Sequence, residues 1–116
     1  AVADARRNAE LNGADNVEFI AGEAEKAVPE LYGRGVRADV VVLDPPRKGC
    51  DESLLKLLSE MEPKRIVYIS CNPATLARDL KYLDGRGYKA VEAQPVDMFP
   101  WTWHVECLVL MSRVKD

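Results

Sequence analysis

The sequence is poor in cysteine and histidine and has no long apolar run, and each absence excludes a class of protein. Its three cysteines show no repeated spacing, so we expect neither a disulfide framework nor a paired-cysteine zinc site, and no bound metal. No apolar run approaches the roughly 20 residues that span a bilayer, and the first residues do not resemble a signal peptide. These features predict a cytoplasmic protein with reduced thiols and no membrane partner.

An excess of basic residues is absent as well, since the formal net charge is −3. Contacts to phosphate supply most of the affinity for nucleic acid, so this charge argues against strong binding of RNA by these residues alone. The 116 residues, 47% hydrophobic and 30% charged, are typical of one globular domain and too few for two cores. We therefore expect residues 1–116 to form a single unit.

Helical and strand patterns alternate along the chain, which predicts an α/β fold with a mainly parallel, doubly wound sheet. The apolar run at 38–43 is continuous, as in a strand covered on both faces. No helical pattern separates the last two strands, so we expect them to be antiparallel neighbours at one end of the sheet. The expected helices cover residues 2–12, 24–32, 51–61 and 72–83, and the expected strands cover 17–21, 38–43, 65–70, 89–96 and 105–111.

The polar and reactive residues of this sequence follow its strands. Segments 22–23, 44–49 and 70–73 each leave the carboxyl end of an expected strand, which is where ligands bind in open α/β sheets. Segment 99–106 joins the last two strands and would reach the same edge if they are antiparallel. We therefore expect one functional site along this edge of the sheet.

The tetrapeptide Asp44-Pro45-Pro46-Arg47 comes directly after the second expected strand. It has a structural interpretation as a rigid turn, because each proline fixes φ and removes a backbone donor. It also has a functional one, as a rigid shelf beside a planar base or cofactor, with Asp44 as a hydrogen-bond acceptor. The motif alone leaves both open.

Cys71 directly follows the next expected strand and stands just before the start of a helix. Most buried cysteines are inert, but the unpaired N–H groups and the dipole of a helix N-terminus favour a thiolate. This position predicts a nucleophile. Cys50 lies in a loop beside Asp51 and Glu52, which disfavour a thiolate, and Cys107 lies inside the last strand, so both are expected to be structural.

Glu106 begins the last strand after a stretch that holds Phe99, Trp101 and Trp103. A glutamate at a strand edge is normally solvated, whereas these aromatic neighbours would keep water from it, as a general base requires. His104, two residues earlier on the same face of the strand, is a candidate for shaping the site.

Three motifs together resemble the RNA 5-methyluridine methyltransferases, the family that methylates uracil at C5 in 23S rRNA and tRNA. The resemblance covers essentially the whole chain. The matching stretches are Leu-Asp-Pro-Pro-Arg-Lys-Gly at 43–49, Tyr-Ile-Ser-Cys-Asn-Pro-Ala-Thr-Leu-Ala-Arg-Asp at 68–79, and Asp-Met-Phe-Pro-Trp-Thr-Trp-His-Val-Glu at 97–106.

The resemblance implies a Rossmann-like methyltransferase fold that uses S-adenosylmethionine. It matches Cys71 to the family nucleophile, which forms a covalent adduct with C6 of uracil, and Glu106 to the base that removes the C5 proton. Asp44 and Glu23 match positions that hold the cofactor. The candidates for the substrate side of the site are Pro45, Pro46, Arg47, Asn72 and His104.

The family pattern also includes elements that this sequence lacks. The first two strands, with their Gly-rich turn and acidic residue, would precede residue 1, as would any upstream RNA-binding domain. We therefore expect a truncated fold that is inactive in isolation. The whole enzyme is expected to bind RNA, 23S rRNA rather than tRNA, mainly through the missing parts. The absent strands would lie between 17–21 and 38–43, so these two strands either pair directly or leave an edge open to a second copy.

Two other functions compete with this one. An exocyclic-amine methyltransferase would also use Asp44-Pro45-Pro46, but such enzymes place an aromatic residue where this chain has Arg47, and they need no Cys71. An inactive RNA-binding module is disfavoured by the negative charge and by the presence of both Cys71 and Glu106.

Overall fold

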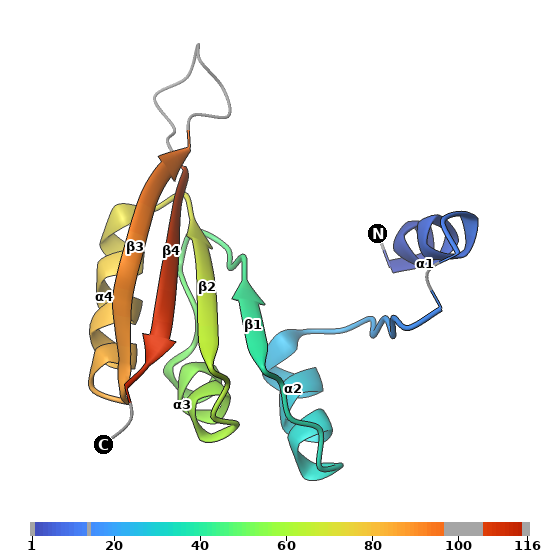
Figure 1. Ribbon diagram of the computed structural model, residues 1–116, viewed down its shortest axis with the longest axis horizontal. Coiled ribbons are helices and arrows are strands. Elements are labelled where there is room, and N and C mark those ends of the chain that lie inside the picture. Colours follow the sequence, from blue (N-terminus) through green and yellow to red (C-terminus); the bar gives the residue numbers. More distant parts are fainter. Residues whose placement is uncertain (1, 14, 97–105, 115–116) are drawn as a thin grey trace.

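The computed structural model describes residues 2–13, 15–96 and 106–114, which form a four-stranded sheet with helices (Figure 1). Within these ranges no helix has the length and apolar character needed to cross a membrane. The elements are α1 (Val2–Leu11), α2 (Ala24–Gly33), β1 (Val40–Leu43), α3 (Glu52–Glu60), β2 (Arg65–Ser70), α4 (Pro73–Asp84), β3 (Tyr88–Val96) and β4 (Glu106–Arg113).

The strands lie in the order β1-β2-β4-β3, with β1 and β2 parallel and the other two pairings antiparallel. The expected antiparallel pair at one end of the sheet is confirmed. The expectation of a mainly parallel sheet is confirmed in strand direction, because β1, β2 and β3 run the same way and only β4, which lies between β2 and β3, is reversed. Two βαβ units, β1-α3-β2 and β2-α4-β3, join strands of the same direction, and the chain then turns back through β4 between β2 and β3.

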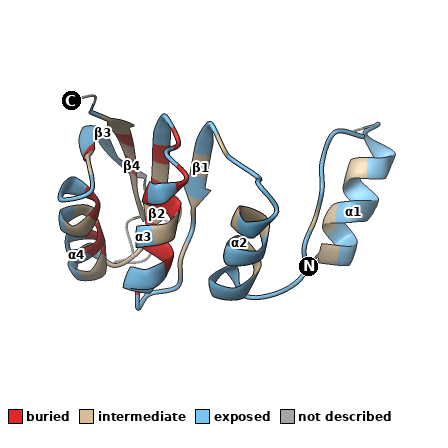
Figure 2. Cartoon of the chain, turned by 90° about the horizontal axis from the view of Figure 1, so that it is seen from below, coloured by how far each residue is buried: buried red, intermediate tan, exposed pale blue. Residues whose placement is uncertain are grey.

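The core lies between one face of the sheet and helices α3 and α4, where the buried residues gather (Figure 2). On this face Ile66 and Tyr68 of β2 pair with Met111 and Val109 of β4, and all four side chains are buried. The opposite face is open, since Val42 of β1 is 62% exposed. The expectations of a doubly wound sheet and of a strand covered on both faces are therefore wrong for the part of the chain described here.

Helix α4 shows how local sequence and packing agree. Asn72 is its N-cap and accepts a hydrogen bond from the Ala74 N–H at 3.0 Å, and Pro73 occupies the first turn, where its missing N–H costs nothing. Leu76 and Leu83, seven residues apart, place one face of the helix in the core. The predicted helices are confirmed to within two residues at each end.

The predicted strand at 17–21 is wrong: this segment belongs to no sheet, and all of it except the partly buried Phe19 is exposed. Figure 1 shows that it runs away from the sheet toward α1, and its described tie is a hydrogen bond from Arg6 Nη2 to the Phe19 carbonyl at 2.9 Å. A strand requires a neighbour for its ladder, and no described strand pairs with 17–21. Direct pairing of 17–21 with β1 does not occur.

Candidate functional site

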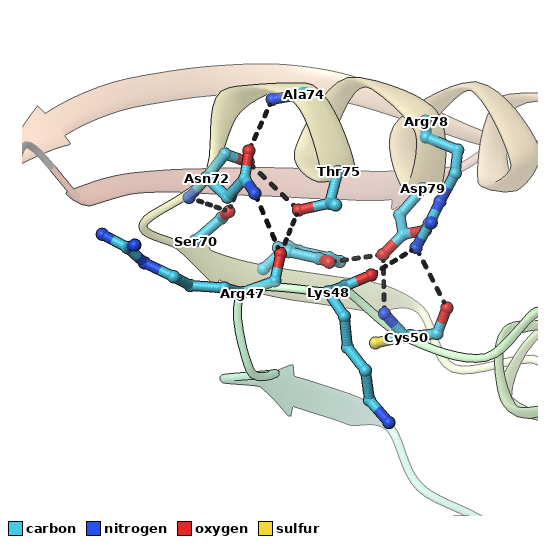
Figure 3. A network of polar contacts seen from close by, with 10 residues as sticks. Arg47, Lys48, Cys50, Ser70, Asn72, Ala74, Thr75, Arg78 and Asp79 are labelled. Atoms are coloured by element: carbon cyan, nitrogen blue, oxygen red, sulfur yellow. Dashed lines mark hydrogen bonds and ion pairs between the residues drawn. The ribbon is translucent and has the colours of Figure 1, made fainter.

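The turns after β1 and β2 leave the same edge of the sheet and touch each other. β1 and β2 are parallel, with Leu43 paired to Tyr68, so the segments that follow them leave the sheet in the same direction. The Arg47 carbonyl accepts hydrogen bonds from Asn72 Nδ2 at 3.0 Å and from Thr75 Oγ1 at 2.9 Å (Figure 3). The expected meeting of segments 44–49 and 70–73 at one edge is confirmed.

The register of β2 and β4 places Glu106 beside Cys71. Ser70, the last residue of β2, pairs with Cys107, the second residue of β4. Cys71 and Glu106 are the next residues along these two antiparallel chains, so they stand at opposed positions. Both are partly buried, and Cys71 directly precedes the N-cap of α4.

Glu23 and Asp44, 21 positions apart in sequence, line one cavity of about 500 Å³. The cavity lies between the start of α2 and the turn after β1, and Pro45, Pro46 and Leu54 contribute to its wall. Carboxylates accept hydrogen bonds from hydroxyl and amino groups, and the apolar wall suits a flat ring. This arrangement is suited to a polar ligand with an aromatic part.

Asp79 on α4 is a buried carboxylate, 2% exposed, that holds the turn after β1. Its Oδ2 accepts hydrogen bonds from the backbone N–H of Cys50 at 2.9 Å and from the Tyr68 hydroxyl, and its Oδ1 accepts one from Arg78 Nε at 3.1 Å. Arg78 Nη2 in turn donates to the Lys48 carbonyl at 2.8 Å. Figure 3 shows these contacts as one continuous network.

Cys50 belongs to this network and is structural, as predicted, although for another reason. Burial raises the pKa of its thiol to about 11, and the negative charge of Asp79 adds to the effect. Its neighbours Asp51 and Glu52 are exposed. The pKa of Tyr68 is also raised, first by burial and then by its hydrogen bond to Asp79.

Gly49 is the residue that lets this turn approach α4. Its φ is +80°, and an added Cβ would lie 2.5 Å from Arg78 Nη2 and 2.8 Å from Asp79 Oδ2. An added side chain would collide with α4, and the positive φ disfavours any residue with a Cβ. Glycine is therefore required at this position for the network to form.

Replacing Gly49 by alanine is expected to lower the free energy of unfolding by about 3 kcal/mol, the sum of left-handed backbone strain and overpacking. Gly35 is the matched control, since its φ is +86° and nothing lies within 4 Å of an added Cβ. Gly35→Ala should cost only the strain, about 1 kcal/mol. Urea unfolding of both variants measures the difference, and equal losses would contradict the steric explanation.

Tyr68, Thr75 and Asp79 also build the site, although none of them was predicted from the sequence to do so. One signal was present: Asp79 lies three residues after Leu76 and four before Leu83, on the apolar face of α4. A carboxylate on such a face must be paired or hydrogen-bonded. Asn72, expected on the substrate side, uses its side chain to cap α4 and to bind the Arg47 carbonyl. His104 lies outside the described residues.

The family described as tRNA (uracil-5-)-methyltransferase matches residues 1–114 of this chain. An RNA methyltransferase of Bacillus cereus is 64% identical over 115 residues, which are 99% of this chain and 25% of that protein. A second RNA methyltransferase, from Halalkalibacterium halodurans, is 60% identical over 112 residues, or 97% and 24% of the two chains. The chain thus spans about a quarter of the length of the curated relatives that it matches.

Solved structures give the same picture of the fold. The tRNA (uracil-54, C5)-methyltransferase of Pyrococcus abyssi, solved with S-adenosyl-L-homocysteine, is 40% identical, with a TM-score of 0.77 over 95% of this chain and 26% of that one. The precorrin-6y C5,15-methyltransferase of Geobacter metallireducens is 16% identical, with a TM-score of 0.68 over 93% and 60%, and supports the fold alone. The predicted fold, a truncated Rossmann-like methyltransferase fold, is confirmed.

Proposed function

This chain belongs to the tRNA (uracil-5-)-methyltransferase family, and we propose that residues 1–116 are the C-terminal portion of the catalytic domain of a cytoplasmic RNA uracil-5-methyltransferase. The observation that carries the proposal is the pairing of Ser70 with Cys107, which sets Glu106 opposite Cys71 at the end of the sheet. A nucleophile and a base facing each other are what covalent activation of uracil requires.

The chemistry assigns one step to each of these residues. The Cys71 thiolate adds to C6 of uracil, and the electrons of the C5–C6 double bond move toward C5 and the C4 carbonyl. C5 becomes a nucleophile that can take a methyl group. Glu106 then removes the C5 proton, and the electron pair left behind restores the double bond and expels Cys71 as a thiolate.

S-adenosylmethionine is the methyl donor in this proposal, and it would supply an electrophilic methyl group. The cavity that contains Glu23 and Asp44 fits such a molecule, because its carboxylates can accept hydrogen bonds from amino and hydroxyl groups. Leu43, Pro45 and Leu54 offer apolar surface to a purine ring. The structure solved with S-adenosyl-L-homocysteine supports this class of ligand.

Residues near Cys71 at this edge of the sheet would receive the target base. We assign Pro45 and Pro46 as a rigid shelf, and Arg47, Asn72 and His104 as candidates for the substrate side of the site. We propose 23S rRNA rather than tRNA as the substrate. Mapping the 5-methyluridine that disappears from each RNA on deletion of the gene distinguishes the two, and loss from tRNA alone would overturn the rRNA assignment.

Trapping with RNA that contains 5-fluorouridine tests the proposed chemistry in the full-length protein. Fluorine at C5 cannot leave as a proton does, so the adduct with Cys71 should persist after methyl transfer and be visible as a shifted band on a denaturing gel. An exocyclic-amine methyltransferase would methylate without an adduct. An inactive RNA-binding module would do neither, so the three hypotheses give different results.

Residues 1–116 alone are expected to bind S-adenosylmethionine more weakly than micromolar. Glu23 and Asp44 supply acceptors, but the Gly-rich turn and the acidic residue that such folds place on their first two strands are not part of this stretch. Titration calorimetry on residues 1–116, with the full-length protein as control, measures this. Micromolar binding to residues 1–116 would contradict the expectation.

A further inference from the structure

Three segments of the site meet at the carboxylate of Asp79. Tyr68, which donates its hydroxyl to Asp79, lies three residues before Cys71 on β2. Cys50, which donates its backbone N–H at 2.9 Å, ends the turn that begins at Asp44. Asp79 itself belongs to α4, the helix that begins just after Cys71. One buried side chain therefore ties the turn that carries Asp44 to the strand and helix that carry Cys71.

The N-cap residue and one face of α4 form hydrogen bonds with this turn along its length. Asn72 and Thr75 bind the carbonyl of Arg47, and Arg78 binds the carbonyl of Lys48. Residues three and four apart in a helix share a face, which explains why positions 72, 75, 78 and 79 can act together. Figure 3 shows these side chains reaching from the helix to successive carbonyls and to the N–H of Cys50.

A carboxylate is required at position 79, because all its described partners are donors. Oδ2 accepts from the Cys50 N–H and from Tyr68, while Oδ1 accepts from Arg78. An asparagine would present an N–H₂ group either to Arg78 or to the Cys50 N–H, and one of these contacts would face donor to donor. With the side chain 2% exposed, water would not replace the lost bond.

We propose that Asp79 is a positioning residue that sets the alignment of the methyl-donor side of the site with Cys71. This inference rests on the proposed function, in which the donor occupies the cavity beside Asp44 and the uracil is bound to Cys71. Methyl transfer requires the bound donor and the Cys71-bound uracil to be aligned with each other. Donor binding alone, or attack of Cys71 on C6 alone, does not require this alignment.

Donor binding and the attack of Cys71 on C6 can be measured separately from methyl transfer in the full-length protein. Addition of Cys71 to C6 lets C5 take up a deuteron from heavy water, and removal of the original C5 proton by Glu106 then expels Cys71. Uracil leaves with deuterium at C5, and the methyl donor takes no part. Exchange at C5 thus reports on Cys71 and Glu106, calorimetry reports on the donor cavity, and only methyl transfer reports on their alignment.

Asp79→Asn should lower the rate of methyl transfer at saturating donor by about tenfold to 100-fold, the usual effect of a displacement near 1 Å. C5 exchange and the dissociation constant of S-adenosylmethionine should each change by less than about threefold. Asp84→Asn is the matched control, because Asp84 lies on the same helix, is 52% exposed and pairs only with Lys89 among the described residues. It should leave the ratio of methyl transfer to exchange unchanged.

Tyr68→Phe removes one of the contacts while keeping the ring, and it should give a smaller but equally selective loss of methyl transfer. It decides the question if Asp79→Asn fails to fold. Equal losses of exchange and methyl transfer, or no loss of either in both variants, would overturn the role of Asp79. A wild-type protein that shows neither exchange nor methylation would instead overturn the proposed function, and this inference with it.

Discussion

Cys71→Ser in the full-length protein is expected to lower the rate of RNA methylation by on the order of 10⁴-fold or more and to abolish the adduct with 5-fluorouridine RNA. C5 of uracil is a poor nucleophile until a thiolate adds at C6, and a serine hydroxyl is not ionised at neutral pH. Methyl transfer from radiolabelled S-adenosylmethionine, together with a denaturing gel for the adduct, measures both effects.

Cys107→Ser is the matched control for this substitution. Cys107 is half-buried and lies on β4 opposite Ser70, one position from Glu106, but it is not at the end of a strand before a helix. Its replacement should leave adduct formation within about threefold of the wild type, as for other conservative changes outside the reacting groups. A Cys71→Ser protein that still forms the adduct, or a Cys107→Ser protein that does not, would show that the nucleophile is misassigned.

Glu106→Gln is expected to lower turnover by about 10²-fold to 10⁴-fold and to trap the enzyme on ordinary uridine RNA. Glutamine has the size of glutamate but cannot accept the C5 proton. Cys71 would still add and C5 would still be methylated, so a methylated covalent complex should accumulate. Mass spectrometry of the complex would show the mass of RNA plus one methyl group.

Glu92→Gln provides the comparison, since Glu92 lies on the neighbouring strand β3 and is exposed. This variant should release methylated RNA at the wild-type rate and leave no complex. If Glu106→Gln loses turnover without accumulating the complex, Glu106 acts before methyl transfer and not as the base that ends the reaction. If it keeps full turnover, another group removes the proton.

The helices could be predicted from sequence because their signals are local. Asn72 and Pro73 mark the start of α4, and Asp51 marks the start of α3, each ahead of leucines spaced for one buried face. The strand at 17–21 was predicted on the same kind of pattern and is wrong, because a strand also depends on a neighbour that its own residues do not supply.

Local sequence signals were enough to predict which residues stand at the ends of strands, and therefore that Asp44 and Cys71 share an edge of the sheet. They were enough because strand ends and helix starts are encoded within a few residues. That Glu106 stands opposite Cys71, 35 positions away in sequence, could be learned only from the register of β2 and β4. The same holds for the hydrogen bond from the Cys50 N–H to Asp79, 29 residues away, and for the close approach that Gly49 permits there. Hydrogen bonds between distant residues leave little trace in local patterns, because their partners meet only after the sheet and α4 have packed.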